Sequence, residues 1–354
     1  MRAADNARMH NVLVDTSALP LEAWLKAVRA RRLPLLQRAL RLAVVVAADA
    51  PAADAQAAWL SPAERWMRCS LGLDAPELGL PDQQAPWAAM AALALGASPG
   101  DAAWGLAVPV HLLLGRDSLQ LADPTQLQLD AGHAQALLDA VLPLLHEQQW
   151  QARLLRPGCW LLAHPSLREV RSADPLRAIG RNAASWMPGG DAAAPWRRLL
   201  TEIQMVWQDH PVNQQRRELG LPEVNSLWLH GCGVLPLLPS SPFVADAAQA
   251  RSWRDGSCAW LGALGDALPS LPQSRHPHPL RVLQPQPQSA LDVESACAEL
   301  DRGFDAELRQ ALQAHSAARV VLAGSRAWIE LELRRSRAWR FWRDRAAAQL
   351  LERI

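Results

Sequence analysis

Apolar residues recur every three or four positions in several parts of the chain, the spacing that predicts amphipathic helices. The clearest stripe covers residues 195–208, where Trp196, Leu199, Ile203 and Trp207 share one face and charged side chains take the other. We interpret both tryptophans as core residues. The same spacing predicts further helices over residues 21–33, 62–71, 130–150 and 291–314.

Other stretches alternate apolar and polar residues or form short apolar runs, and these patterns predict strands. Residues 327–333, AWIELEL, alternate cleanly, so this strand should have one face in water. Residues 42–46 and 225–229 are short apolar runs typical of buried strands. Turn residues separate paired strands in two predicted hairpins, at residues 106–122 and 151–163.

The predicted elements suggest three consecutive regions. Residues 1–100 indicate a helical N-terminal region, and residues 101–190 an α+β unit of hairpin, helix and hairpin. Residues 191–354 contain the strongest helix and the later strands, so they indicate an α/β core. Prolines interrupt residues 236–290, which therefore should not hold long regular elements.

Charge and cysteine content narrow the functional classes. The 354 residues carry 36 bases against 35 acids, a net charge of +1, which excludes a chain-wide cationic surface for nucleic acid. The five cysteines form no CxxC pair, which argues against a disulfide framework or a cysteine-rich zinc site. The chain has no tyrosine, so tyrosine acids and nucleophiles are excluded. Without a signal-peptide pattern or an apolar run near about 20 residues, we expect a cytoplasmic protein with no membrane span.

The most informative segment is residues 210–233, HPVNQQRRELGLPEVNSLWLHGCG. His210 should end the long helix, because the residue before a proline avoids helical angles, and a short second helix should follow. Asn213 and Arg216 share a face of that helix, and Asn225 begins the next strand. One hypothesis is that these four side chains converge on a phosphate or carboxylate, since an arginine with two amides suits an anion. The alternative is structural: Asn213 caps the helix, Arg216 pairs with a nearby acid, and Asn225 fixes a turn.

The spacing in this segment resembles that of a known family. The pattern His-Pro-x-Asn-x-x-Arg-x-x-x-Gly, an asparagine five residues later and a strand ending in Gly-x-Gly are similar to the archaeal-type cofactor-independent phosphoglycerate mutases of the alkaline phosphatase superfamily. Residues 195–233 and 327–345 are closer still to a family of RpfE-type regulatory proteins. The resemblance implies an α/β fold: a degenerate alkaline-phosphatase or phosphoglycerate-mutase-like mixed sheet with helices, plus the helical N-terminal region and the α+β insert.

The same resemblance sets a chemical requirement. Enzymes of this superfamily need two divalent metals and a serine or threonine nucleophile, with carboxylates and histidines as metal ligands. Here the first predicted strand ends at Asp15 beside Thr16 and Ser17, where the family has Asp-Gly, and the residues after Gly324 supply no Asp/His pair. The sequence therefore predicts a metal-free, cofactor-free and non-catalytic relative with a regulatory or metabolite-binding role. The alternative is a metal-dependent phosphoglycerate mutase or phosphatase with unrecognised ligands.

Two weaker patterns suggest other partners. His230 and Cys232 could supply two zinc ligands, but a structural site needs four, and the nearest other histidines are His276 and His278. Arginines interleave with aromatic residues in residues 334–345, which suits nucleic acid but equally suits an amphipathic strand. We expect neither zinc nor nucleic acid. The expected partners are a phosphorylated or carboxylate small molecule and a regulatory protein.

Overall fold

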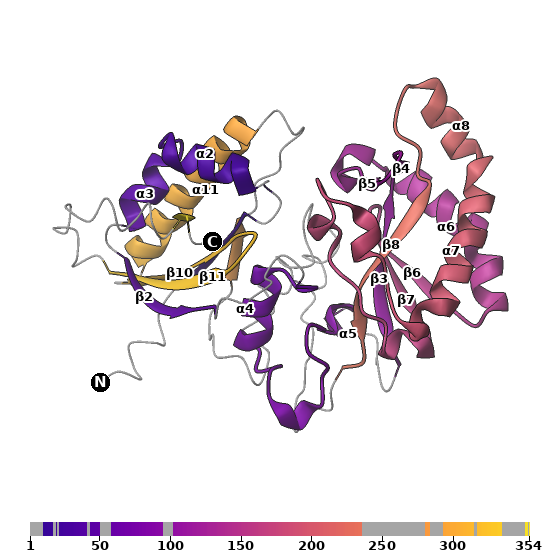
Figure 1. Ribbon diagram of the computed structural model, residues 1–354, viewed down its shortest axis with the longest axis horizontal. Coiled ribbons are helices and arrows are strands. Elements are labelled where there is room, and N and C mark those ends of the chain that lie inside the picture. The colour runs from indigo at the N-terminus through magenta and orange to yellow at the C-terminus, as the bar shows by residue number, and fades with distance from the viewer. Residues whose placement is uncertain are drawn as a thin grey trace. The chain divides into compact units, whose positions relative to one another are not determined.

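Figure 1 shows the computed structural model of the protein. Ser17, His276, His278 and residues 335–345 lie outside the part that the structure describes. Within that part, no helix combines the length and the apolar character that a bilayer span requires. The described residues are 10–16, 19, 21–40, 43–49, 58–94, 102–235, 280–283, 293–314, 317–334, 351–352 and 354.

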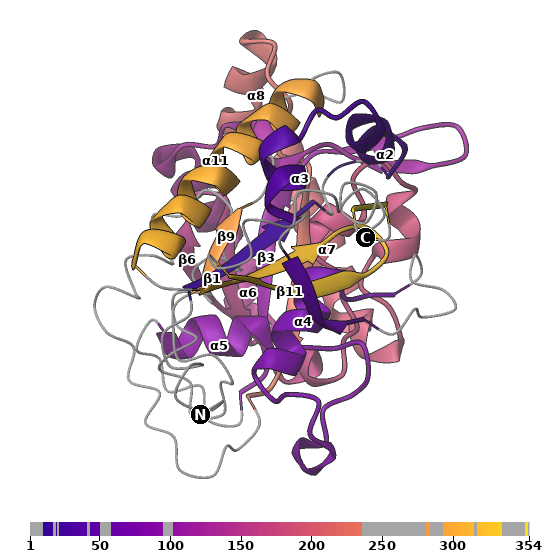
Figure 2. The same cartoon turned by 90° about the vertical axis from the view of Figure 1, so that its left-hand side faces the viewer.

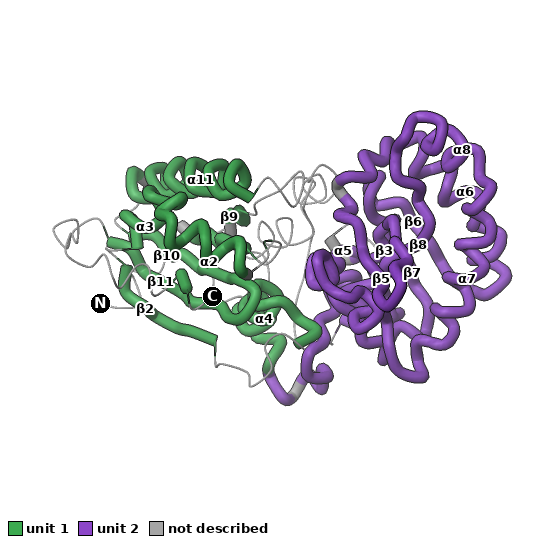
Figure 3. Tube along the Cα trace, turned by 45° about the horizontal axis from the view of Figure 1, so that its top comes forward, with its two compact units in different colours: residues 1–74, 261–354 green, residues 75–260 purple. Residues whose placement is uncertain are grey.

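The chain divides into two compact units (Figure 3). Unit 1 combines residues 1–74 with residues 261–354, and unit 2 is the continuous segment 75–260. This division differs from the three consecutive regions that we expected, because strands from both ends of the chain pair in one sheet. The expected boundaries after residues 100 and 190 both fall inside unit 2.

Unit 1 is built on a five-stranded mixed sheet with the order β2-β11-β10-β1-β9. Its strands are β1 (His10–Asp15), β2 (Ala43–Ala48), β9 (Leu280–Leu283), β10 (Ala317–Ala323) and β11 (Trp328–Arg334). β1 is parallel to both β9 and β10, whereas β11 and β2 continue the sheet in antiparallel pairing. Strands covered on both faces need continuous apolar runs, and Val12, Leu13 and Val14 of β1 are fully buried. The mixed sheet confirms the predicted α/β class.

Helices cover both faces of this sheet. They are α2 (Leu21–Arg29), α3 (Pro34–Leu40), α4 (Pro62–Ser70) and α11 (Val293–Ala314). α2, α3 and α11 pack on one face, where they share an apolar core with Ile329 and Leu331 of β11 (Figures 1 and 2). α4 packs on the other face, where the Trp66 indole N–H donates to Glu330 at 3.1 Å. The predicted polar face of β11 is therefore covered by α4, and Glu330 is 9% exposed.

Unit 2 has an antiparallel sheet with the order β6-β7-β3-β8. Its strands are β3 (Trp104–Val110), β6 (Gln151–Arg156), β7 (Cys159–Ala163) and β8 (Ser226–Gly233), with a separate hairpin of β4 (Leu112–Leu114) and β5 (Leu119–Leu121). Its helices are α5 (Trp87–Ala94), α6 (Ala131–Glu147), α7 (Ala194–Gln208) and α8 (Pro211–Glu218). α6 and α7 share one apolar core with the sheet, to which Trp196 and Trp207 both contribute as expected.

α5 approaches the sheet closely at Gly231. This glycine has a φ of +61°, and a Cβ added to it would lie 3.0 Å from the Cβ of Trp87 and 3.6 Å from Leu106 Cδ1. Both the left-handed backbone and the short contact exclude larger residues, so the glycine turn noted in the sequence is a packing requirement of β8.

Two strand predictions need correction. The run at residues 106–114 is two strands interrupted at His111, because β3 pairs in the four-stranded sheet and β4 pairs with β5. The apolar run predicted as a buried strand at residues 42–46 is the edge strand β2, and Val45 and Val46 are 44% and 51% exposed. An apolar run does not by itself distinguish an edge strand from a central one.

Asp301 of α11 links two helices of unit 1 and provides a test of the packing. Its carboxylate accepts the backbone N–H groups of Leu35 and Leu36 at 3.1 and 2.7 Å, at the start of α3. Asp301→Ala should lower the free energy of unfolding by about 1–3 kcal/mol, because two backbone donors lose their partner. Urea denaturation of the full chain measures this change.

Asp305→Ala is the matched control on the same helix. It removes only an i,i+4 ion pair with Arg309, so the expected change is below about 0.5 kcal/mol. Equal losses in the two variants would contradict the assigned role of Asp301.

Candidate functional site

The four residues of the predicted anion site lie around the short helix α8. His210 is its N-cap, and the ring Nδ1 accepts the backbone N–H of Val212 at 3.2 Å. Asn213 is buried and uses its whole amide: Nδ2 donates to the carbonyl oxygens of Trp207 and Val224 at 2.8 and 2.9 Å, and Oδ1 accepts the Val224 N–H at 2.9 Å. Asn213 therefore fastens the end of α7 to the segment that enters β8.

Arg216 and Asn225 also bind backbone groups. The Arg216 Nε donates to the carbonyl oxygen of Pro222 at 2.7 Å, and an Nη of the same side chain donates to that of Leu127. The Asn225 amide pairs with one residue, accepting the Leu112 N–H at 2.7 Å and donating to the Leu112 carbonyl at 2.8 Å. It thereby mimics a strand pairing at the point where β4 begins.

Each of the four side chains bonds to backbone groups that a turn or a helix end would otherwise leave without partners. Binding of an anion at this corner stays a prediction. The structural alternative predicted caps, pairs and turn contacts for these residues; the structure shows such contacts, but with different partners. His210 caps α8 in place of Asn213, and Arg216 binds carbonyl oxygens in place of an acid.

A different polar cluster lies where β8 meets the short 3-10 helix η5 (Pro175–Arg177). Asp174 Oδ1 caps η5 by accepting the Leu176 N–H at 2.8 Å, and Asp174 Oδ2 lies 4.0 Å from His230 Nδ1 of β8. Both side chains are buried, as is that of Arg177. Buried ionisable groups are uncommon unless they are paired or functional. We name this group the β8 cluster; it comprises Asp174, Arg177, Arg181, Trp186 and His230.

Two arginine side chains of this cluster lie against the Trp186 indole. Arg177 Cζ lies 4.9 Å and Arg181 Cζ 5.8 Å from the ring centroid, and Arg181 Nη1 also donates to the Arg177 carbonyl oxygen at 3.3 Å. Burial lowers the pKa of the Arg181 guanidinium. Two guanidinium groups beside one ring, with limited access to water, favour an anionic neighbour.

Burial also decides the protonation of the groups along β8. It lowers the pKa of the His230 imidazole, which Asp174 raises in part and Arg156 lowers further, so the ring is neutral at pH 7. Burial raises the pKa of the Cys232 thiol to about 12. A thiol that remains protonated is neither a nucleophile nor a metal ligand at neutral pH, so Cys232 is a core residue.

The carboxyl ends of β1 and β10 form the edge at which open α/β sheets bind ligands. Asp15 and Thr16 are buried there, and the Thr16 hydroxyl donates to the Ala323 carbonyl oxygen at 3.2 Å. Gly324 follows β10, and a Cβ at that position would collide with the carbonyl group of Ile354. Ile354 is 1% exposed, so it occupies the space beside Gly324 at this edge.

The donors at this edge do not fit a centre of two divalent cations. Across the described ranges, no three His, Cys, Asp or Glu side chains are grouped so that they could hold a metal ion. The segment that follows β10 is Gly324, Ser325 and Arg326, which offers no carboxylate or imidazole, while a binuclear centre needs several such ligands.

Comparison with known proteins gives distant similarities. No protein-family model matches the chain. The curated 2,3-bisphosphoglycerate-independent phosphoglycerate mutase of Methanothrix thermoacetophila is 29% identical over 72 residues, 20% of this chain. That match spans 18% of the length of the relative.

Two solved structures resemble the chain over most of its length. The PH0037 protein from Pyrococcus horikoshii has a TM-score of 0.44 and 12% identity, with 98% of each chain covered. The cofactor-independent phosphoglycerate mutase from Thermoplasma acidophilum has a TM-score of 0.34 and 16% identity, with 92% of this chain and 90% of the other covered. Both scores lie below 0.5, a range in which two chains need not share a fold.

Sequence reasoning missed most of the β8 cluster. It considered His230 as a zinc ligand and as a base beside Cys232, and it did not connect two local signals elsewhere in the chain. Asp174 before Pro175 is an N-cap followed by a proline in the first turn, and Arg177 and Arg181 are four residues apart. No local pattern joins Asp174 to His230, because their proximity depends on the packing of η5 against β8.

Asn213 provides the first test of this site. Asn213→Ala should lower the free energy of unfolding by about 2–4 kcal/mol, because two carbonyl groups and one N–H lose their partners inside the protein. The control is Gln215→Ala, an exposed position on the same helix, with an expected change below about 0.5 kcal/mol. Unchanged stability in Asn213→Ala, together with lost affinity for phosphate, would support the anion-site hypothesis.

His230 provides a test through pH. Its pKa is lowered in the folded state, so below pH 6.5 the unfolded chain takes up the proton first and stability falls as the pH falls. Uptake of one such proton by the unfolded chain lowers the free energy of unfolding by up to about 1.4 kcal/mol per pH unit. His230→Asn should lack this contribution between pH 6.5 and 5, measured by urea denaturation at several pH values. His164 and His210 are present in both proteins, so equal slopes would show that His230 is not held neutral.

Proposed function

We propose that the protein is a non-catalytic relative of the cofactor-independent phosphoglycerate mutases. It acts by binding a phosphorylated or carboxylate metabolite, in a regulatory role of the RpfE type. The motif in residues 210–233 and the short match to a curated phosphoglycerate mutase support the relationship. The name of that relative indicates the ligand class, since phosphoglycerates carry both a phosphate and a carboxylate.

The observation that carries the proposal is the position of Ile354 beside Gly324, at the carboxyl edge of the unit 1 sheet. Two contacts hold the described residues there: the Trp24 indole N–H donates to the Leu351 carbonyl oxygen at 2.9 Å, and the Arg326 N–H donates to that of Ile354 at 3.0 Å. Substrate and metal ions at this edge would need the space that Ile354 occupies beside Gly324. A binding role requires no such space in unit 1.

The β8 cluster supports an anionic ligand in unit 2. Arg177 and Arg181 supply two guanidinium groups, the side chain that pairs most specifically with phosphate and carboxylate oxygens. The neutral His230 ring lies beside the Asp174 carboxylate, with Nδ1 4.0 Å from Oδ2. In this proposal the arginines bind the anion, and the histidine and aspartate position the groups around it.

One feature favours a metal-dependent phosphatase as the second candidate: Asp15 and Thr16 place a carboxylate beside a hydroxyl at the end of a parallel strand. The Thr16 hydroxyl donates to the Ala323 carbonyl oxygen, however, which directs it along the sheet edge. A turnover assay distinguishes the two candidates.

The assay incubates the full chain with Mn²⁺, Mg²⁺ or Zn²⁺ and either 3-phosphoglycerate or p-nitrophenyl phosphate. We expect no turnover above that of an Asp15→Asn variant with any of the three cations. Turnover in the wild type that this variant abolishes would replace the binding proposal with the phosphatase.

The proposed binding of an anionic metabolite is measured separately by calorimetry, with 3-phosphoglycerate and, as a second probe, inorganic phosphate. Arg181→Gln, at a half-buried position, should weaken binding about tenfold, the effect of losing roughly 1.4 kcal/mol of charge-assisted hydrogen bonding. Arg197→Gln on the exposed face of α7 should leave binding unchanged. Equal affinity in wild type and Arg181→Gln, or no binding to wild type, would remove the β8 cluster as the ligand site.

A further inference from the structure

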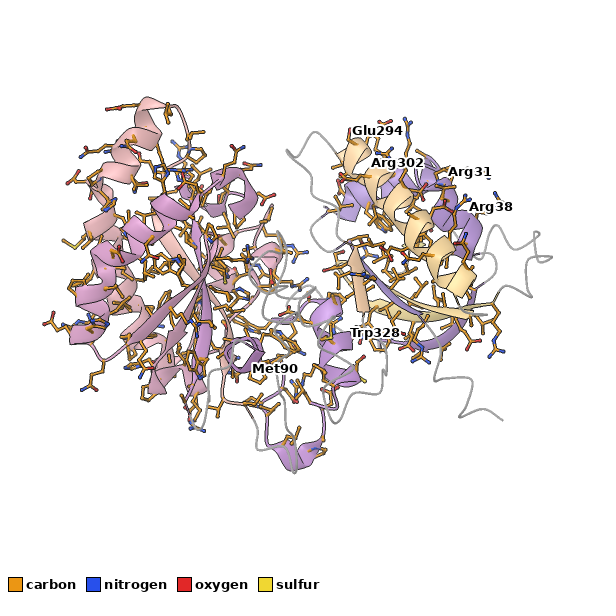
Figure 4. The ribbon with its side chains drawn as sticks, turned by 180° about the vertical axis from the view of Figure 1, so that it is seen from behind. Arg31, Arg38, Met90, Glu294, Arg302 and Trp328 are labelled. Carbon is orange, nitrogen blue, oxygen red and sulfur yellow. The ribbon has the colours of Figure 1, made fainter. Side chains whose placement is uncertain are left out.

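The helices α2 and α3 of unit 1 present a surface on which bases predominate. Apart from Glu22 in the first turn of α2, every exposed charged residue of the two helices and the turn between them is basic. Arg302 of α11 is exposed next to them, and Figure 4 shows it on the helical side of unit 1 with Arg31 and Arg38. We name this group the α2–α3 basic surface; it comprises Lys26, Arg29, Arg31, Arg32, Arg38 and Arg302.

Backbone contacts hold these residues close together. The turn between the helices is tight, since the N–H groups of Arg31 and Arg32 donate to the Val28 and Ala27 carbonyl oxygens at 3.1 and 2.9 Å. Gln37 of α3 donates to the same Val28 carbonyl at 3.0 Å, which brings Arg38 beside the end of α2. Asp301 caps the start of α3, so its neighbour Arg302 borders the same surface.

The turn itself points to a role for the side chain of Arg31. Its φ is +55°, in the left-handed region that favours glycine or asparagine. The backbone conformation therefore does not account for an arginine at this position. Its exposure shows that packing does not account for it either.

Acidic neighbours neutralise only part of this charge. Arg29 pairs with Glu352 at 3.2 Å and Arg32 with Glu294 at 2.7 Å, and all four side chains are 39% exposed or more. Ion pairs this exposed contribute about 0–1 kcal/mol, so a stronger anion can displace them. The net charge of +1 for the whole chain conceals this local excess of bases.

The surroundings of the basic surface favour nucleic acid over a lipid surface. The large apolar side chains of both helices, among them Trp24, Val28 and Leu36, are buried in the unit 1 core. A helix that binds a membrane inserts an apolar face, and none is free on these helices as described. Five of the six bases are arginines, which pair with phosphate oxygens through two parallel donors.

We infer that the α2–α3 basic surface binds the phosphate backbone of double-stranded nucleic acid without sequence preference. All six members are cations that pair with phosphate oxygens, and contacts to phosphate carry no sequence information. Binding should weaken steeply with salt, because each contact between a base and a phosphate releases condensed counterions.

The experiment measures fluorescence anisotropy of a labelled 20-base-pair DNA duplex with the full chain between 50 and 200 mM NaCl. The variant Lys26→Gln/Arg31→Gln/Arg38→Gln removes three bases that are exposed on helix or turn surfaces, so it should remain folded. It should bind about tenfold more weakly at 50 mM salt, and the slope of log K against log salt should fall by about 2.7, or 0.9 for each base. The control Arg197→Gln/Arg198→Gln removes exposed bases from α7 and should match the wild type.

Thermal unfolding of all three proteins shows whether each is folded. The inference is overturned if the wild type does not bind the duplex at 50 mM salt, or if the triple variant binds with an unchanged salt slope. It is also overturned if poly-glutamate or vesicles of anionic phospholipid bind through these residues and the duplex does not. A duplex of different sequence should bind with the same affinity, and a large difference would contradict backbone binding.

Discussion

The parallel pairing of β1 with β10 is the interaction on which unit 1 depends. It aligns Val12 with Val320 and Val14 with Leu322, residues separated by more than 300 positions of chain. All four side chains are fully buried, so the pairing places the centre of the sheet inside the core formed with α2, α3 and α11. It also brings the carboxyl ends of both strands to one edge. The space at that edge determines whether unit 1 can hold a ligand there.

Hydrogen-bond satisfaction of the backbone gives each polar residue of the motif in residues 210–233 a structural role. In residues 210–233 the polar side chains end helices and begin strands, where backbone groups lack regular partners. Of the β8 cluster, only His230 lies in this segment.

Much of the secondary structure was predictable, because hydrophobic periodicity reports which side of an element is buried. The stripe through Trp196 and Trp207 identified α7, and the alternation at residues 327–333 identified β11. Periodicity does not report what covers a face, so neither the packing of α4 on Glu330 nor the edge position of β2 followed from it. The candidate site was less predictable still, since Asp174 and His230 are neighbours only through tertiary packing.

The discontinuous composition of unit 1 has a consequence for how the chain folds during synthesis. β1 leaves the ribosome long before residues 317–323, with which it pairs. Closing so long a loop is slow, and meanwhile the apolar strand β1 has no partner in its own sheet. Unit 2, whose residues are continuous, can form its sheet in that interval. Until it pairs, β1 is therefore an apolar segment of the nascent chain that is open to chaperones and to aggregation.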